Sequence, residues 1–490
     1  MSEKPKQEKI TRRNYLKYAA AGVVAVGVAG ALGYEAYQAS QPPAPQQVVT
    51  QTATQVVTQT GTAPPPAKGL TIISVNDPFV GALKDVATAF QKNTGIPVTV
   101  SNYPYSDTHA KEVLAASAQS SAVDIFITDV PWMGEFGEAG YLDPLDDRVA
   151  KSDIASSFFK DLLPINQAGG SWKGKIYTLY FGPYVNLGYY RKDLLATASS
   201  NIVDIITKAE QSPINFDDYR TVAQYFTNNS KYPDVYGTAL NLASGDAIGQ
   251  GWFEYIWDVG KGGSYFQGMK PGAPYPSQKP SPDWTPTFDS DESKDVLNWQ
   301  KEMVKYMPPG ALSVDWPART TLFTTKKVFF DYAWTVEIPG MLNPKTSQVA
   351  DNVGYFLFPK NPASAYWVPP FGGWGIGLNP YGTHKDDAWK FIEYFLGDAH
   401  LTFARASALG CTNADFKDPE MLKFPWMGAL QKSFESCYVE CRPRIPESEE
   451  IISSIGTIAS QSASGGISVA DAAARMQTFV TTVMKRDGYL

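Results

Sequence analysis

Histidine is scarce in this chain. Only three of the 490 residues are histidine, namely His109, His384 and His400, and they are scattered along the sequence. Zinc sites built on imidazole and Ser-His-Asp catalytic groups both need a histidine beside further functional side chains. The scarcity disfavours both kinds of site, so we expect no metal ion and no Ser-His-Asp catalysis.

Cysteine is equally scarce. The chain has Cys411, Cys437 and Cys441 and no other. For a protein outside the cell two interpretations are open. Either Cys411 forms a disulfide with Cys437 or Cys441 and one thiol is left over, or all three are buried thiols.

Charge is sparse, and its sign is wrong for a nucleic-acid partner. Charged residues make up 19% of the chain and the net charge is −7. Residues 1–34 contribute +4, so the remainder sums to −11. A nucleic-acid-binding protein needs a basic face, and we therefore expect no nucleic-acid partner.

Aromatic residues, in contrast, are abundant. The chain contains 27 Tyr, 25 Phe and 12 Trp, and 43% of its residues are apolar. Its length allows two or three domains, each with a core of its own. The aromatic excess indicates a surface that stacks on a ligand.

The N-terminus combines a basic segment, residues 1–17, with an apolar one, residues 18–34. Arg12 and Arg13 lie in TRRNYLK, which resembles the twin-arginine export motif Ser/Thr-Arg-Arg-x-Phe-Leu-Lys with Tyr for Phe. No clean A-x-A cleavage site and no cysteine for a lipid follow. We expect an exported protein that residues 18–34 anchor at the outer face of the cytoplasmic membrane, or a secreted one if that segment is cleaved.

Residues 35–69 read as a tether. They contain the direct repeat QVVTQTAT and QVVTQTGT between proline clusters, and only Glu35 and Lys68 are charged. Such a composition cannot bury a core, so we expect an extended Thr/Gln/Pro-rich linker.

Strand and helix patterns alternate from residue 70 onward. LTIISV at 70–75 is typical of a buried strand, Asp77 and Pro78 are typical of a helix start, and Gly95 of a helix end. IPVTV and DIFIT are further strands, with a helical pattern between them. This order predicts an α/β sheet whose ligands bind beyond the carboxyl ends of the strands.

A series of longer motifs carries a family resemblance. They are LTIISVNDPFVGALKDVATAFQKNTGIPVTV, DIFITDVPWMGEFGEAGYLDPLDD, IYTLYFGPYVNLGYYRKDLL, TKKVFFDYAWTVEIPGM, VGYFLFPK, GGWGIGLNPYGTHKDDAWKFIEYFLGD and RPRIPE. Their order over nearly all of residues 70–490 resembles family 1 extracellular solute-binding proteins, the sugar-binding group that includes maltose-binding protein. The resemblance implies an α/β, two-lobed periplasmic-binding-protein-like fold, with discontinuous lobes joined by hinge crossovers.

The resemblance also implies boundaries and a function. Lobe one would comprise residues 70–183 and 353–400, and lobe two residues 184–352 and 401–490. The protein would be a monomeric substrate-binding component of an ABC importer, with no cofactor and no enzymatic activity. It would deliver a sugar, expected to be a di- or oligosaccharide, to the permease subunits. The alternatives are the same fold with iron, a polyamine or a phosphate ester, and a secreted glycoside hydrolase.

Candidate ligand contacts follow from sugar chemistry. Sugar rings lie flat on aromatic side chains, while their hydroxyls pair with carboxylates, amides and arginine. Most candidates would face the space between the lobes by their place in the family motifs, and Trp374 also by its glycine-rich surroundings, PPFGGWGIGLNPYG. Tyr103 and Tyr105 in SNYPYSDTH could form an aromatic lip, and Trp252 and Trp257 lie in QGWFEYIWDVG. The candidates are Trp334, Trp374, Asp129, Trp132, Tyr184, Glu337, Asn76, Asp77, Tyr103, Tyr105, Trp252, Trp257 and Arg444.

Several of these residues have a structural alternative. Trp374, which looks exposed among its glycines, could instead pack against a neighbouring loop, and Asp77 could be only a helix cap. Trp252 and Trp257 stand five residues apart, so one would reach the ligand while the other packs in the core. Where maltose-type members carry a further stacking aromatic, this chain has Ser-Glu-Glu at 448–450, which puts a long malto-oligosaccharide platform in doubt.

Overall fold

The computed structural model describes residues 69–271 and 283–490. These residues belong to one compact unit, Ala67–Leu490. The expected export signal and anchor, and all but the last residue of the expected tether, lie outside the described residues. Within the described ranges, no helix combines the length and apolar character that crossing a membrane requires.

The N-terminal strands form a parallel sheet, as the alternating pattern predicts. β1 (Leu70–Val75) lies between β2 (Val98–Tyr103) and β3 (Ile125–Asp129). The apolar side chains of β1 and β3 are buried, because helices cover the sheet. The predicted strands and the predicted helix end at Gly95 are confirmed, and Gly95 adopts φ +77° where α2 (Val80–Thr94) stops.

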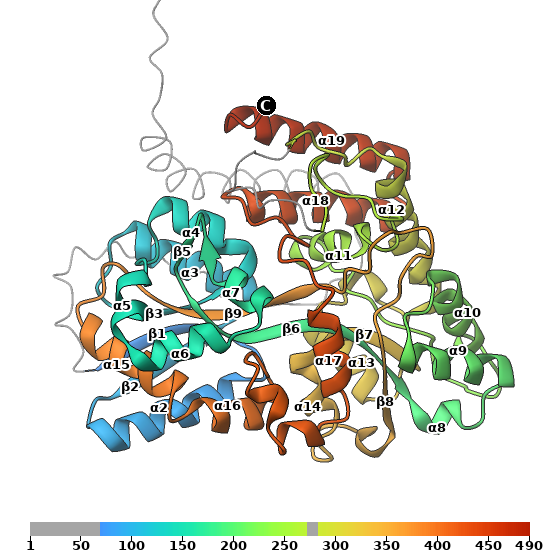
Figure 1. Ribbon diagram of the computed structural model, residues 1–490. Helices are drawn as coiled ribbons and strands as arrows, with labels where there is room; N and C mark the ends of the chain where they lie inside the picture. The colour runs from blue at the N-terminus through green and yellow to red at the C-terminus, as the bar shows by residue number, and fades with distance from the viewer. Residues whose placement is uncertain (1–68, 272–282) are drawn as a thin grey trace, which may run out of the picture. The chain divides into compact units, whose positions relative to one another are not determined.

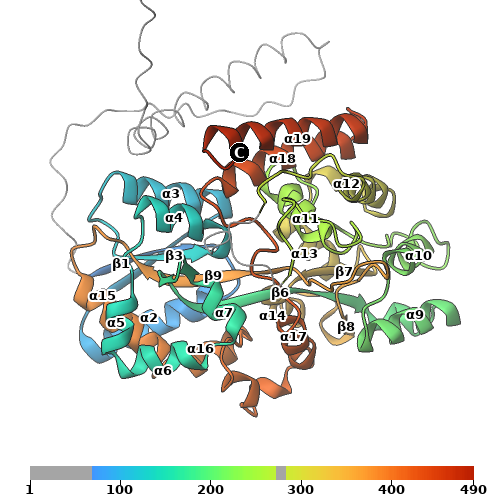
Figure 2. The same ribbon diagram turned by 45° about the horizontal axis from the view of Figure 1, so that its top comes forward.

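β6 (Leu179–Arg191) joins two groups of strands. Its first part pairs with β9 (Phe371–Leu378), which also pairs antiparallel with β3. Its second part pairs with β7 (Phe330–Trp334) and β8 (Val353–Phe356). Figures 1 and 2 show β6 passing from the strands around β3 and β9 to those around β7 and β8.

We call the two groups lobe one and lobe two. Lobe one contains β1, β2, β3, β9 and the first part of β6; lobe two contains the second part of β6, β7 and β8. Figure 1 shows the helices beside each group. On the lobe-one side lie α2, α3 (Tyr105–Ser117), α4 (Met133–Ala139), α5 (Asp146–Lys151), α6 (Asp153–Asp161), α7 (Pro164–Gly169), α15 (Lys385–Leu396) and α16 (His400–Ser407).

The remaining helices lie on the lobe-two side. They are α8 (Lys192–Leu195), α9 (Ser200–Gln211), α10 (Phe216–Phe226), α11 (Asp246–Ile256), α12 (Asp291–Met303), α13 (Trp316–Thr324), α14 (Ile338–Met341), α17 (Met427–Phe434), α18 (Ser448–Ala463) and α19 (Val469–Arg486). Short β4 (Ser171–Trp172) and β5 (Lys175–Ile176) form a separate hairpin.

The expected lobe boundaries remain a prediction, but two contacts bear on them. Residues 353–356 were expected in lobe one, yet as β8 they pair with β6 on the lobe-two side. The first residues after 400 were expected in lobe two, yet Phe403 in α16 packs on Phe79 and Phe181 of lobe one. These contacts favour crossovers between β8 and β9 and after α16.

Helices α11 and α18 pack unusually closely. A Cβ atom on Gly456 in α18 would lie 1.9 Å from the carbonyl oxygen of Gly245, and one on Gly249 in α11 would lie 2.1 Å from that of Ile452. Only glycine allows the two backbones to approach this closely. The contact holds α18 against α11 at Ile452 and Gly456.

The three cysteines are free thiols. Cys411 and Cys441 are buried, and Cys437 is partly buried. Sγ of Cys437 lies 3.3 Å from the carbonyl oxygen of Pro369, and Sγ of Cys441 lies 3.3 Å from that of Phe371. Of the two interpretations, the structure supports the free thiols and not the disulfide.

Candidate ligand-binding site

Two acidic residues stand where neighbouring strands of lobe one end. Asp77 follows β1, and Asp129 is the last residue of β3. β9 runs antiparallel beside β3 and places Trp374 opposite Asp129. Because the carboxyl ends of parallel strands meet at one edge of a sheet, the three side chains gather on the edge where α/β folds bind ligands.

The glycines around Trp374 serve strand packing. Gly373 has φ +117°, and a Cβ atom there would lie 2.0 Å from the carbonyl oxygen of Gly182. At Gly375 it would lie 2.1 Å from Oγ1 of Thr178. Trp374 is therefore held within a tightly packed strand and is only 3% exposed. The expectation of an exposed indole on a loop is wrong.

Asp77 accepts two hydrogen bonds through one oxygen. The Tyr184 hydroxyl and Nε1 of Trp374 both donate to Oδ2, each at 2.9 Å. Burial raises the pKa of Asp77 to about 7, although the two hydrogen bonds oppose this effect. Asp77 is not the cap of α2, whose N-cap position is Phe79 and has no side-chain hydrogen bond.

Asp129 is the partner of a tyrosine and an arginine. The Tyr105 hydroxyl donates to Oδ2 at 2.9 Å, and a guanidinium nitrogen of Arg442 lies 3.5 Å from the same oxygen. Oδ1 accepts the backbone N–H of Val130 at 2.7 Å. Burial raises the pKa of Asp129 even though Arg442 and Tyr105 stabilise its charge.

Four aromatic side chains form a cluster between the lobes. The centroid of Tyr105 lies 5.0 Å from that of Trp132, 6.0 Å from that of Trp374 and 5.7 Å from that of Trp316. Trp132 and Trp374 are 5.5 Å apart. Trp316 comes from α13 in lobe two and the other three from lobe one, so this interlobe aromatic cluster bridges the two halves.

Arg442 is a site residue that the sequence did not single out. Its guanidinium lies 5.4 Å from the Trp334 ring and donates to Oε1 of Gln250 at 2.7 Å and to the carbonyl oxygen of Phe371 at 3.3 Å. It thereby connects a stacking tryptophan of lobe two with Asp129 of lobe one. The RPRIPE motif was the available signal, but it contains two arginines.

The sequence predicts a ligand contact for Arg444, the other arginine of that motif. Arg444 donates to the carbonyl oxygens of Ala168 at 2.7 Å and Ser171 at 2.6 Å. These bonds hold the segment between α7 and β4. Arg444 therefore has a structural role here, and its expected contact with a ligand is not supported.

Trp334 and Glu337 lie together at the end of β7. Trp334 is 8% exposed, and its ring lies 6.3 Å from that of Tyr184. Glu337, in the turn Thr335–Glu337, accepts from the Arg319 guanidinium at 2.7 Å and from the Thr320 hydroxyl. Burial raises the pKa of Glu337, which Arg319 opposes. Glu337 is therefore already paired with lobe-two residues.

A second polar group lies on the other side of Trp132. Nε1 of Trp132 donates to Oε2 of Glu449 at 3.2 Å, and Nε2 of His109 lies 2.7 Å from Oε2 of Glu135. Burial raises the pKa of Glu449 to about 7, with His109 opposing and Asp246 adding to the shift. Glu449 and Asp246 begin α18 and α11, so lobe-two carboxylates face lobe-one rings here.

Four further candidates lie elsewhere. Asn76 is exposed and accepts from Asn102 at 2.7 Å, and Tyr103 lies under the Lys111 ammonium group at 4.5 Å. Trp252, in α11, and Trp257, directly after it, are both core residues. Trp252 stacks on Phe288 with 4.7 Å between centroids, and Nε1 of Trp257 donates to the carbonyl oxygen of Cys441 at 2.8 Å. The expectation that one of them reaches the ligand is wrong.

The resulting site combines flat apolar faces with buried polar groups. The faces are the interlobe aromatic cluster and Trp334; the polar groups are Asp77, Asp129 and Arg442. Such a surface complements a small molecule that has apolar C–H faces and hydrogen-bonding edges. In this structure the polar groups are paired with one another and with the rings.

Known proteins resemble the chain over most of its length. It is 24% identical to a probable amino-acid ABC transporter periplasmic-binding protein of Sinorhizobium fredii over 421 residues, covering 84% of this chain and 88% of the relative. It is 25% identical to a mannitol-binding protein of Pseudomonas aeruginosa over 390 residues, covering 72% and 78%.

Solved structures confirm the expected two-lobed α/β fold. An ABC transporter solute-binding protein of Agrobacterium radiobacter, in complex with ribitol, superposes with a TM-score of 0.74 and 26% identity. The match covers 85% of this chain and 99% of that protein. The family model described as bacterial extracellular solute-binding protein matches residues 76–400. With its strand order, crossover strand and interlobe site, the chain belongs to the bacterial extracellular solute-binding protein family.

Proposed function

We propose that the protein is the substrate-binding component of an ABC importer and captures a sugar or polyol between its lobes. One observation carries the ligand class: the interlobe aromatic cluster lies beside Asp77, Asp129 and Arg442 at the carboxyl ends of the strands. Ring faces suit sugar C–H groups, and paired carboxylates and a guanidinium suit hydroxyls. The mannitol-binding relative and the ribitol complex are consistent with this class.

The ligand would enter by separation of the lobes. The rings of the cluster are 5.0–6.0 Å apart, a spacing typical of direct aromatic contact. A sugar stacked on Tyr105 would displace Trp316, which belongs to the other lobe and whose ring lies 5.7 Å from that of Tyr105. Opening about β6 and the crossover before β9 would separate these rings, and closure over the ligand would present a distinct surface to the permease.

The size of the ligand is limited by Glu449. This residue stands where a further stacking aromatic is expected in maltose-type members, and it is engaged with Trp132. A polar, partly charged side chain offers no apolar face to another sugar unit. A polyol, a monosaccharide or a disaccharide therefore fits the site better than a long oligosaccharide.

A cationic ligand is the second candidate. Asp77 has two further carboxylates near it, because Asp129 and Glu337 both raise its pKa by their negative charge. Aromatic rings beside carboxylates also bind ammonium groups. One relative is named as a probable amino-acid transporter component. Arg442 and Arg319 oppose this reading, since they balance much of the negative charge.

The wider assignment follows from these proposals. No chemistry on the ligand is needed, so the protein would act as a binding protein and not as an enzyme. It would work as a monomer at the outer face of the membrane, held by residues 18–34, and would deliver its ligand to permease subunits. Detection of the uncleaved chain in the membrane fraction would support the anchor, and release after cleavage would contradict it.

Thermal-shift measurements test the ligand class. The panel contains ribitol, mannitol, maltose and maltotriose, with amino acids, polyamines, ferric iron and phosphate esters as competing classes. A ligand at one hundred times its dissociation constant stabilises the folded protein by about 2.7 kcal/mol. We expect a rise in melting temperature with a polyol or sugar, and a rise with amines alone would overturn the proposal.

A further inference from the structure

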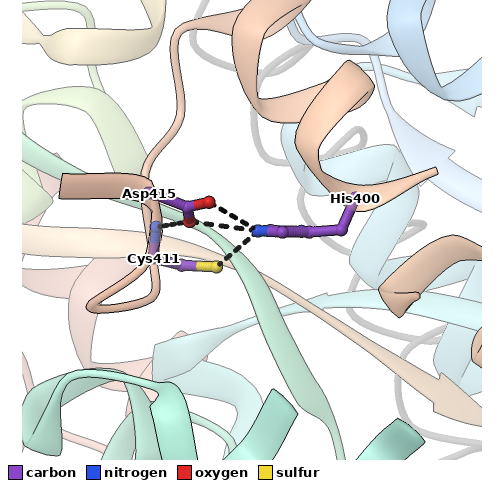
Figure 3. Close-up of side chains that lie close together, drawn as sticks. All are labelled: His400, Cys411 and Asp415. Carbon is purple, nitrogen blue, oxygen red and sulfur yellow. Dashed lines mark hydrogen bonds and ion pairs between the residues drawn. The ribbon is translucent and has the colours of Figure 1, made fainter. Parts of the chain in front are cut away.

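Three potential metal ligands meet at a buried point in the segment after α15. They are His400, the first residue of α16, Cys411 in the following loop, and Asp415 in the turn Asp415–Lys417. Nε2 of His400 lies 3.0 Å from each carboxylate oxygen of Asp415 and 3.9 Å from Sγ of Cys411. Figure 3 shows the three side chains pointing toward one another.

The spacing of these atoms is close to that of a tetrahedral zinc site. One nitrogen, sulfur and oxygen atom from the three residues lie within 4.8 Å of one another. Zinc bonds of about 2.0–2.3 Å imply roughly 3.3–3.6 Å between ligand atoms. Shortening these separations by no more than about 1.2 Å would therefore bring an imidazole, a thiolate and a carboxylate into bonding positions.

The carboxylate is oriented by groups outside the cluster. Oδ2 of Asp415 accepts the backbone N–H groups of Cys411 at 2.8 Å and Thr412 at 3.0 Å. The carbonyl oxygen of Cys411 in turn accepts from Nδ2 of Asn166 at 2.8 Å. Such supporting hydrogen bonds hold metal ligands in place and restrict their rotation.

The imidazole is held by an aromatic contact on one side and by Asp415 on the other. The Phe158 ring packs edge-on against His400, with 5.0 Å between centroids. Among the described residues, Nδ1 of His400 has no hydrogen-bond partner. Without a cation, Nε2 donates its proton to the Asp415 carboxylate. Because Nδ1 has no competing partner, the proton can move to Nδ1 when Nε2 binds a cation.

We propose that His400, Cys411 and Asp415 bind a zinc-class divalent cation. Binding would release the thiol proton of Cys411 and place the imidazole proton on Nδ1. A divalent cation with one thiolate, one carboxylate and a neutral imidazole has no net charge. This balance suits the site, because the side chain of Asp415 is 1% exposed and Cys411 is 0% exposed.

The ion would have a structural role. The loop that carries Cys411 is joined to the end of α6 through the backbone contacts Leu162 with Thr412 and Asn413 with Asp161. It is joined to α7 through Asn166. α16, which carries His400, packs on α2. A cation would therefore tie α16 to the loop and to α6, independently of the ligand site.

Cobalt binding to the full-length protein tests the site. The purified protein is treated with a chelator and a thiol reductant, desalted, and titrated with Co²⁺. We expect saturation at one equivalent, with visible bands of a tetrahedral ion and a near-ultraviolet thiolate-to-cobalt band. One equivalent of Zn²⁺ should abolish these bands. Absence of the thiolate band from the wild-type protein would overturn the proposal, whatever the variants show.

Variants assign the ligands. Cys411→Ser should remove the thiolate band, and His400→Gln should weaken cobalt binding at least tenfold. Cys437→Ser is the matched control and should bind as the wild type does. An unchanged thiolate band in Cys411→Ser would overturn the assignment. The assignment would also be overturned if Cys437→Ser removed the band while Cys411→Ser kept it. Circular dichroism checks that each variant is folded.

Discussion

Trp132 of lobe one donates its indole N–H to the Glu449 carboxylate of lobe two at 3.2 Å. The carboxylate is partly buried between the lobes, and Asp246 and His109 are close enough to affect its pKa. Each lobe thus supplies one partner of a hydrogen bond whose acceptor changes charge near neutral pH. The contact between the lobes therefore depends on the protonation of Glu449.

Stability should fall as the pH rises toward neutrality. Burial raises the pKa of Glu449 from 4.5 to about 7, so the folded protein holds a proton that the unfolded chain loses. The favourable contribution is fully present below pH 4.5 and is lost as the pH rises through about 7, on the order of 3 kcal/mol in all. Urea unfolding at several pH values should show that the unfolding free energy of Glu449→Gln declines less with rising pH than that of the wild type.

The matched control for this experiment is Glu435→Gln. Glu435 is exposed and follows α17, so its substitution should leave the decline unchanged. The pKa of His109 is also raised, because Glu135 outweighs its burial, and this adds a decline of the same sign. An equal pH dependence for wild type and Glu449→Gln would contradict the assignment to Glu449.

Asp77→Asn should separate ligand binding from folding. Asparagine keeps an oxygen that accepts from Tyr184 and Trp374, so the unfolding free energy should change by no more than about 1 kcal/mol. Loss of the charge should weaken ligand binding at least tenfold, about 1.4 kcal/mol. Calorimetric titration with the stabilising ligand measures this, and the exposed neighbour variant Asn76→Ala should bind normally.

Arg442→Lys should lower the stability of the folded protein and weaken ligand binding. Lysine cannot reproduce the bonds to Gln250 and the Phe371 carbonyl oxygen while also facing Trp334. We expect a loss of about 3 kcal/mol in stability, together with weaker ligand binding. Arg405→Lys, in an exposed pair with Asp418, should cost less than about 1 kcal/mol. If Arg442→Lys and Arg405→Lys lowered the unfolding free energy equally, the contacts of Arg442 would not be important for stability.

Gly456→Ala should be strongly destabilising. The added Cβ atom would lie 1.9 Å from the Gly245 carbonyl oxygen, and relief requires α11 and α18 to separate. We expect a loss of about 3 kcal/mol. At Gly428, in α17, a Cβ atom meets nothing within 4 Å, so Gly428→Ala should be neutral or stabilise by about 0.5 kcal/mol. Melting temperatures of the two variants give the comparison, and similar values would contradict the packing argument.

Some site residues could be predicted from local sequence. Asp77, Asp129 and Trp132 follow apolar strand patterns, and a strand end in an α/β sheet faces the ligand edge. Trp374 was predicted at the site, but its burial was not, because GGWGIG looks like a loop and forms β9. The strand becomes evident only once β3 and β6 lie on either side of it.

Other residues could not be chosen without the fold. Arg442 and Arg444 belong to one motif, and their directions depend on an irregular segment packed between lobes. Trp252 and Trp257 differ in direction around α11, yet both are buried because α11 is enclosed on all sides. His400 and Cys411 are eleven residues apart and Cys411 and Asp415 four residues apart, and only the fold shows that their side chains meet.

By itself, the amino-acid sequence determined the alternation of strands and helices, the acidic strand ends and the family, since these depend on periodicity and short-range order. Only the tertiary structure decided which side chains from distant segments meet. Trp316 with Tyr105, Glu449 with Trp132, and Arg442 with Trp334 are partners because the chain crosses between its lobes. Such contacts depend on how the two groups of strands that share β6 are arranged in space, and no local pattern encodes that arrangement.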